Sequence, residues 1–500
     1  MKSSASLNGS ATAADAPPTG AVASGPRWDL IFLCAALAGM TILDLSKVTV
    51  ALPGIANDLG AGPTGLQFVM AAYIVSYAVV LVPAGRLGDS RWRKHIMVAS
   101  VVLYLAASAA SALAPNVTVL VAARIAQGLS AGMLMPQVLG IMHANLHGPD
   151  RGRGFGLYGA TVNASIAIGP LLGGALMVLA GTDSSWRMVF WMNIPIGVAA
   201  LLAVQRFAPI GKGAPPLRSI DGIGLLLFSS GLVSALLPFL ITTGRDSDSA
   251  ARWLLLVPAG LLLALFVIRE RRTVRRGATP LLDRALIRLR PYRTGVGIGA
   301  CWFAANLGVV FVIMLFLQQG LGLSPFAAGL VNVTYALAAG VSSWFGSRII
   351  ANRGRAVVIV GICLALLGLS ASIVVGTAAP AHLVPFLLAA TQAVAGAGAG
   401  LVVSPNQALS LDAVPKSSAS SASAVTQLGQ RVGNSVGTAA CAAAFFALAQ
   451  HHSTAEDAGG LRPAFAGGLV VAATFMIAAL VLSVVDLRSR TSATAIAMTT

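Results

Sequence analysis

Residues 28–52 read WDLIFLCAALAGMTILDLSKVTVAL. Within this apolar run, formal charge occurs only at Asp29, Asp44 and Lys47. A helix of this length can cross a hydrocarbon core about 30 Å thick. Ionisable groups deep in a membrane cost free energy, so Asp44 and Lys47 are expected to serve a function. The stretch therefore predicts a membrane-spanning helix that carries chemistry.

Apolar runs of similar length follow one another along the rest of the chain. Hydrophobic residues make up 56% of the 500 residues and charged residues only 10%. A soluble domain is about 25% charged, so the composition excludes a soluble protein of this length. We therefore predict an all-α polytopic membrane protein with fourteen transmembrane helices. Their predicted ranges are 28–52, 66–84, 95–114, 117–141, 155–180, 187–206, 220–242, 252–269, 294–317, 326–350, 357–376, 383–411, 424–449 and 464–486.

Basic residues outnumber acidic residues by 33 to 16, which gives a formal net charge of +17. In a soluble protein this excess would suggest a nucleic-acid partner. If the N-terminus lies inside the cell, 26 basic residues fall in cytoplasmic segments and 4 in outside segments. Because cytoplasmic loops of membrane proteins are enriched in Lys and Arg, this division predicts an N-in, C-in topology and no nucleic-acid partner.

A basic loop at 270–293 divides the chain into a block of eight spans and a block of six. The two blocks share a weak echo, since GLSAGMLMP at 128–136 resembles GAGAGLVVSP at 396–405. Such an echo suits a transporter built from two related halves. Small residues at this spacing also serve ordinary helix packing, so the echo alone is a weak signal.

Two further ionisable residues, Arg124 and Arg431, lie inside predicted spans. Helix rise places Asp44 about 24 Å and Arg124 about 26 Å from the cytoplasmic ends of their helices, which predicts a similar depth for both. Lys47 shares a helix face with Asp44. A carboxylate beside a cation can exchange a proton within the membrane. The alternative is that Asp44 and Lys47 only neutralise each other as a structural pair.

Five motifs point to one family. Leu43–Pro53 is similar to L-D-x-T-x-V-N-V-A-L-P, and Gly85–Lys94 is similar to the loop signature G-x-L-x-D-R-x-G-R-K. Leu120–Gly128 resembles a fourth-helix signature, Gly159–Gly174 an antiporter signature that ends in G-P-x-x-G-G, and Trp186–Gly197 a sixth-helix motif. By these motifs the chain resembles the fourteen-helix drug:proton antiporters of the major facilitator superfamily.

The resemblance covers about residues 28–487 and implies two six-helix bundles with an extra central helix pair. The expected division is a disordered cytoplasmic tail (1–26), an N-terminal bundle (27–206), the extra pair (207–269), a basic cytoplasmic loop (270–293), a C-terminal bundle (294–487) and a cytoplasmic tail (488–500).

The resemblance also implies roles for individual residues. Proton coupling would involve Asp44, Arg124 and Lys47. Conformational gating would involve the loop signature and the antiporter signature, through Gly85, Asp89, Arg93, Lys94, Gly169, Pro170, Gly173 and Gly174. The substrate-cavity candidates are polar or aromatic residues of the cavity-lining helices: Tyr73, Tyr77, Gln127, Trp302, Asn306, Asn332, Tyr335, Asn406, Gln407, Gln430, Arg431 and Asn434. Helix–helix hydrogen bonding is the alternative role for each cavity candidate.

Departures from the family pattern bear on the gate and on the substrate. Ser90 and Trp92 replace the Arg and the second Gly of the loop signature, so we expect a gating contact that is weaker or built differently. Lys47 replaces an apolar residue and Thr49 replaces an Asn. The deep ionisable residues, one acidic and three basic, sum to +2. A positive cavity disfavours dications, so we expect neutral or anionic substrates.

We therefore expect a proton-coupled antiporter that exports small amphipathic molecules, such as drugs, antibiotics or secondary metabolites, across the cytoplasmic membrane. Proton-coupled uptake is the alternative within transport. A membrane-embedded enzyme or a sensor is the alternative of another class, although the sequence offers no catalytic constellation for an enzyme. The proton gradient would supply the energy without a cofactor or metal. The expected partners are the lipid bilayer, the substrate and protons, and the expected state is a monomer.

Overall fold

The computed structural model describes residues 27–181, 184–210, 221–240, 250–276, 280–281, 284–452 and 461–499. Within these ranges the chain is helical and contains no strand. Fourteen helical segments are long and apolar enough to cross a membrane, which confirms the predicted number. The expected tail at 1–26 lies outside the described residues.

The helices before the basic loop are α1 (Trp28–Leu59), α2 (Pro63–Gly88), α3 (Arg93–Ala112), α4 (Val117–Asn145), α5 (Gly148–Ala180), α6 (Arg187–Trp191), α7 (Asn193–Phe207), α8 (Gly222–Leu240), η1 (Ala250–Leu255) and α9 (Leu256–Arg275). The helices from this loop onward are α10 (Arg284–Arg288), α11 (Arg290–Leu315), η2 (Phe316–Gly320), α12 (Pro325–Arg353), α13 (Arg355–Ala378), α14 (Val384–Asp412), η3 (Lys416–Ser418), α15 (Ala419–His452) and α16 (Arg462–Thr499).

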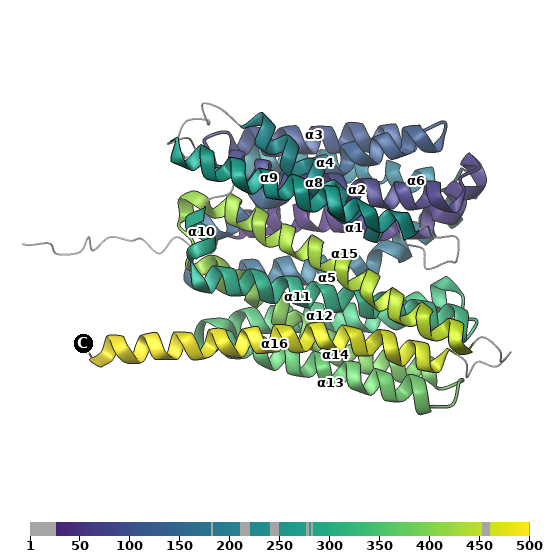
Figure 1. Cartoon of the computed structure of the whole chain (residues 1–500). Helices are drawn as coiled ribbons and strands as arrows, with labels where there is room; N and C mark the ends of the chain where they lie inside the picture. The colour runs from purple at the N-terminus through teal and green to yellow at the C-terminus, as the bar shows by residue number, and fades with distance from the viewer. Residues whose placement is uncertain are drawn as a thin grey trace, which may run out of the picture.

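The helices gather into two bundles, as Figure 1 shows. α1 to α4 lie in the upper half of the view, and α12, α13, α14 and α16 lie in the lower half. The bundles meet where α2 and α4 pack against α15, and where α5 packs against α12 and α14. α8 and α9 form a hairpin outside the first bundle, where Phe228 and Phe266 pack against Ala78 and Val82 of α2. This is the predicted architecture of two bundles with an extra pair.

The glycine echo of the sequence has a structural counterpart in both bundles. A Cβ on Gly128 of α4 would lie 2.3 Å from the carbonyl oxygen of Tyr73 on α2. A Cβ on Gly396 of α14 would lie 2.1 Å from the carbonyl oxygen of Tyr335 on α12. Because only glycine permits this approach, the fourth helix of each bundle packs on the second helix in the same way.

Several helices extend beyond the ranges that hydropathy predicts. α1 continues past Pro53, because a proline near the end of a helix removes only one hydrogen bond. The helix ends where Gly60 adopts a φ of 60°. α9 runs to Arg275, and α16 continues to Thr499. Polar residues such as Arg are good helix formers, so these helices do not need to end at the membrane surface.

Candidate functional site

A buried ion pair joins α1 and α4 inside the first bundle. Oδ2 of Asp44 lies 2.7 Å from Nη1 of Arg124, and both side chains are 0% exposed. The two residues are 80 positions apart in the chain. Their contact confirms the similar depth that helix rise predicts.

Lys47 and Asn193 complete the surroundings of the Asp44 carboxylate. Nζ of Lys47 lies 3.7 Å from Oδ1 of Asp44 and donates a hydrogen bond to Oδ1 of Asn193. Asn193 begins α7 and donates from Nδ2 to Oδ1 of Asp44 over 2.7 Å. Asn193 was not predicted as a site residue, because a neutral amide gives no charge signal. Its position in the Trp186–Gly197 motif was the one available sign.

Arg124 is held by further polar groups on neighbouring helices. Its Nη1 donates to Oε1 of Gln127 over 2.9 Å, and its Nε donates to the carbonyl oxygen of Val69 over 3.3 Å. Gln127 donates to Oγ of Ser108 on α3 over 2.8 Å. The ring of Tyr73 covers the guanidinium, with 4.4 Å between Cζ and the ring centroid. Two predicted cavity residues, Tyr73 and Gln127, therefore lie against Arg124, one of the residues predicted to couple protons.

Asp44, Lys47 and Arg124, called the charged cluster below, carry unbalanced formal charges. The charged cluster contains one carboxylate and two basic groups, all 0% exposed. Among the described residues, no second carboxylate pairs with either base. With both bases protonated the charged cluster would carry +1 away from solvent, and an uncompensated buried charge is costly. With one base neutral, the charges cancel.

The antiporter signature packs directly on the turn of α1 that carries the charged cluster. A Cβ on Gly169 of α5 would lie 1.9 Å from Oγ of Ser46. A Cβ on Gly173 would lie 3.1 Å from the carbonyl oxygen of Lys47. These glycines allow α5 to touch the α1 backbone beside the charged cluster. The other predicted members of the signature lie on the same stretch of α5: Pro170 and Gly174.

An aromatic stack leads from the charged cluster to the second bundle. Tyr73 and Tyr77 on α2 have ring centroids 6.4 Å apart and ring planes inclined by 25°. The guanidinium of Arg431 on α15 lies over Tyr77, with 4.4 Å between Cζ and the ring centroid. Arg124, Tyr73, Tyr77 and Arg431 thus form an arginine–tyrosine stack that crosses the interface between the bundles.

Arg431 is a partly buried cation that makes no ion pair within the described part of the chain. Gln427 and Asn434 share its helix face, one turn to either side. Gln427 accepts a hydrogen bond from the hydroxyl of Tyr77 over 2.5 Å. Nε2 of Gln427 and Oδ1 of Asn434 are buried and have no hydrogen-bond partner among the described residues. Unsatisfied buried polar atoms are uncommon, so this face is suited to bind water or a polar ligand.

Four other cavity candidates lie on α11 and α12. Nε1 of Trp302 and Oδ1 of Asn332 are also buried and lack a partner in the described ranges. Tyr335 donates a hydrogen bond from its hydroxyl to Oδ1 of Asn306. This pair is satisfied internally, whereas Trp302 and Asn332 retain free hydrogen-bonding capacity.

Asn406 lies beside a second buried ion pair, which belongs to the second bundle. Nε of Arg355 on α13 lies 2.7 Å from Oδ2 of Asp486 on α16, and both side chains are at most 1% exposed. Nη1 of Arg355 donates to Oδ1 of Asn406 over 2.5 Å. The structure therefore engages Asn406 in a neutral ion-pair network. The last two cavity candidates, Gln407 and Gln430, are 2% and 8% exposed.

Asp89 joins the two bundles at the end of the molecule that carries the basic loops. Its Oδ1 accepts a hydrogen bond from the backbone N–H of Ser420 over 2.7 Å. Its Oδ2 accepts from the backbone N–H of Ser421 over 3.0 Å and from the Ser421 hydroxyl over 2.6 Å. Both serines lie in the first turn of α15, where backbone donors lack helical partners and favour an anion. Arg93 supports the carboxylate, with 3.8 Å between Nη2 and Oδ1.

These contacts, called the Asp89 latch below, satisfy a carboxylate that is largely buried. Burial raises the pKa of Asp89, and the hydrogen bonds from the start of α15 oppose that rise. Gly85 permits the close contact, because a Cβ there would lie 2.6 Å from a side-chain carbon of α15. All the hydrogen bonds of the Asp89 latch form although Ser90 and Trp92 replace the Arg and the second Gly of the loop signature. Lys94 points elsewhere and donates to a carbonyl oxygen near the end of α7 over 2.6 Å.

Other polar contacts between the bundles lie at the same end. Nη1 of Arg151 on α5 lies 2.6 Å from Oδ1 of Asp412 on α14. A ring nitrogen of His143 on α4 lies 2.9 Å from the carbonyl oxygen of Val414. Together with the Asp89 latch, these contacts hold the bundles closed at the end that carries the basic loops.

Comparisons with known proteins agree with this architecture. The chain matches the family model of the Major Facilitator Superfamily over residues 30–438 and 296–498. It is 31% identical over 457 residues to a probable actinorhodin transporter of Streptomyces coelicolor, across 88% of this chain and 77% of that protein. It is 29% identical over 418 residues to the multidrug resistance protein Stp of Mycobacterium tuberculosis, across 83% and 75% of the two chains.

Among solved structures, the chain is similar to the proton:xylose symporter XylE. The TM-score is 0.57 at 15% sequence identity, and the match covers 90% of this chain and 94% of the other. At this level of identity the likeness concerns the fold.

Asp89→Ala is expected to let the bundles separate at the end that carries the basic loops, because it removes the Asp89 latch. Losing a carboxylate that caps a helix costs about 1 kcal/mol, which corresponds to a shift of about fivefold toward the form open at this end. Arg91 and Ser417 are exposed and can carry spin labels. Double electron–electron resonance would then report the change as a longer distance between the two labels.

Lys94→Ala is the matched control, because it removes a charge from the same loop without touching α15. We expect its distance distribution to equal that of the unsubstituted chain. An Asp89→Ala distribution that also stays unchanged would show that the latch does not hold the bundles together.

Proposed function

We propose that this chain, which belongs to the major facilitator superfamily, is a proton-coupled antiporter. It would export small amphipathic molecules, neutral or anionic, by alternating access. Its relatives include a probable actinorhodin transporter and a multidrug resistance protein. It is a multi-pass protein of the cell membrane. The 26-to-4 division of basic residues supports an N-in, C-in topology, which makes the end with the Asp89 latch cytoplasmic. The antiporter would act as a monomer, driven by the proton gradient.

The observation that carries the proposal is the charge imbalance of the charged cluster. Protonation of Asp44 would leave the cations of Lys47 and Arg124 buried without a counterion. Release of a proton from Lys47 would instead leave a neutral Asp44–Arg124 ion pair. Arginine side chains do not release their proton in proteins, so Lys47 is the base of the charged cluster that can become neutral. Lys47 is therefore the group that binds and releases the transported proton, and Asp44 and Arg124 position it.

Two contacts would connect the proton on Lys47 to movement of the bundles. The α5 backbone touches α1 at Lys47 through Gly173. On the other side, Arg124 begins the arginine–tyrosine stack that ends on Arg431 in the second bundle. Opening of the cytoplasmic end has to separate α2 from α15, and so has to break both the Asp89 latch and the contact between Tyr77 and Arg431.

The face of α15 around Arg431 supports the substrate class. Arg431 offers a cation without an ion-pair partner in the described ranges, beside the aromatic surface of Tyr77. An acidic group on a planar substrate would pair with the guanidinium, while a dication would be repelled by it. One relative, from Streptomyces coelicolor, is by its name a probable actinorhodin transporter. We propose Arg431 as the anchor for anionic substrates.

Lys47→Met is expected to abolish transport driven by a pH gradient in proteoliposomes, because methionine cannot carry a proton. The Asp44–Arg124 pair remains balanced, so the protein should fold and should retain exchange of labelled for unlabelled substrate. Lys47→Arg should fail in the same way, because arginine cannot release its proton. Uphill transport that survives in Lys47→Met would contradict the assignment of the proton site.

Asp44→Asn serves as the contrasting variant in that experiment. It leaves Lys47 and Arg124 without their carboxylate, and removal of one partner from a buried ion pair costs about 3–5 kcal/mol of stability. We therefore expect Asp44→Asn to lower the yield of folded protein, which Lys47→Met should preserve.

Arg431→Gln is expected to separate anionic from neutral substrates. An aromatic carboxylic acid and its primary amide, presented as matched substrates, isolate the effect of charge. Loss of a charge-assisted hydrogen bond should raise the apparent KM for the acid by about tenfold to a hundredfold, with little effect on the amide. Equal changes for both compounds would remove Arg431 from the recognition of the acidic group.

A further inference from the structure

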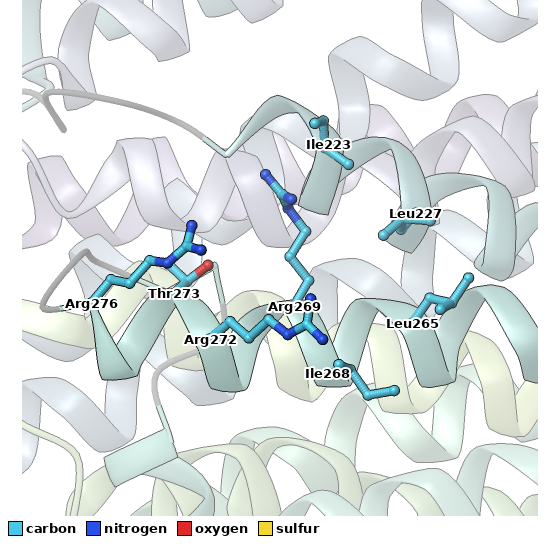
Figure 2. Close-up of a pocket in the computed structure, with 8 residues that line it drawn as sticks. All are labelled: Ile223, Leu227, Leu265, Ile268, Arg269, Arg272, Thr273 and Arg276. Atoms are coloured by element: carbon cyan, nitrogen blue, oxygen red, sulfur yellow. The ribbon is translucent and has the colours of Figure 1, made fainter.

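A pocket of about 370 Å³ opens between α8 and α9, outside the two bundles. Figure 2 shows its eight lining residues, which come from the start of α8 and the end of α9. No transport role described above involves this hairpin. The pocket has a basic end and an aliphatic end, as this list of its residues shows: Arg269, Arg272, Thr273 and Arg276, and Ile223, Leu227, Leu265 and Ile268.

Of the three arginines, Arg269 is already neutralised. Its Nε lies 2.7 Å from Oδ2 of Asp221, and its Nη2 lies 2.7 Å from Oδ1 of the same carboxylate. This fork of hydrogen bonds lowers the pKa of Asp221, so the carboxylate stays charged and the pair stays neutral. In Figure 2 the Arg269 side chain accordingly points from α9 toward the start of α8.

Arg272 and Arg276 supply the unmatched charge of the pocket. Both side chains are exposed, and neither forms an ion pair with a residue that the structure describes. They are four positions apart, so they project from the same face of α9. Thr273 adds a hydroxyl beside them. This end of the pocket presents two guanidinium groups, whose planar donors match the oxygens of a phosphate group.

The aliphatic end of the pocket lies toward the middle of the hairpin, away from the basic loops. Leu265 precedes Arg276 by eleven residues, so the lining extends for about 16 Å along α9. Ile223 is 57% exposed, Leu265 42% and Ile268 46%. A free anion cannot cover these side chains, whereas an acyl chain can cover them while its headgroup reaches the arginines.

We propose that the pocket between α8 and α9 binds the phosphate headgroup and upper acyl chain of one anionic phospholipid. The charge of the ligand follows from Arg272 and Arg276, and its apolar part follows from the aliphatic residues. The site lies at the end of the hairpin that faces the basic loops, where membrane proteins commonly bind acidic lipid headgroups. The proposal does not depend on proton coupling or on the transported substrate.

Native mass spectrometry of the full-length protein in detergent can test the site. Dioleoylphosphatidylglycerol and dioleoylphosphatidylcholine are the probes, since they share acyl chains and differ in headgroup charge. We expect one phosphatidylglycerol molecule to be retained more tightly than phosphatidylcholine. The double variant Arg272→Gln/Arg276→Gln should weaken its retention by about thirtyfold, as expected for two basic residues near an anionic headgroup.

Arg271→Gln/Arg275→Gln is the matched control, because it removes the same charge from the same turns of α9 on a face that does not line the pocket. Retention by this control should equal that of the unsubstituted chain. Three results would overturn the proposal: equal weakening in both double variants, equal retention of the two lipids, or displacement of phosphatidylglycerol by millimolar inorganic phosphate. The mass of a second protein copy in place of lipid would assign the surface to self-association instead.

Discussion

The first bundle depends on the ion pair between Asp44 and Arg124. A charged side chain inside a membrane needs an oppositely charged partner. Asp44 and Arg124 therefore determine which polar groups can lie around them. The carboxylate binds Arg124, Lys47 and Asn193, and the guanidinium in turn binds Gln127 and the backbone of α2. Three helices besides α1 (α2, α4 and α7) therefore contribute polar groups to a single carboxylate and its counterion.

The second bundle repeats the packing of the first but not its chemistry. The glycines of α14 bring it onto α12 as those of α4 bring it onto α2. The buried charges of the second bundle, on Arg355 and Asp486, balance each other. The first bundle holds a fully buried surplus base, and the arginine–tyrosine stack passes from it to Arg431 across the interface. The two halves thus divide the proposed work, with proton binding in one and substrate binding at their boundary.

Hydropathy alone was sufficient for the fourteen spans, because the cost of exposing polar groups to lipid constrains the whole chain. Helix rise was sufficient to place Asp44 near Arg124, since rigid helices convert sequence distance into depth. Some neutral groups escaped prediction or were assigned another role. Asn193 and Ser108 carry no charge that would single them out, and Asn406, expected in a cavity, pairs with Arg355. The partners of Asp89 escaped prediction as well, because backbone N–H groups are present at every helix start. Ser420 lies 331 residues away in the chain.

The central claim is that Lys47 exchanges the transported proton. In an antiporter, substrate binding and protonation compete, so binding of substrate should release a proton from the protein. Calorimetry of substrate binding in two buffers with different ionisation enthalpies counts that proton directly. The account predicts proton release by the unsubstituted chain and none by Lys47→Met. The same release by both proteins would contradict it.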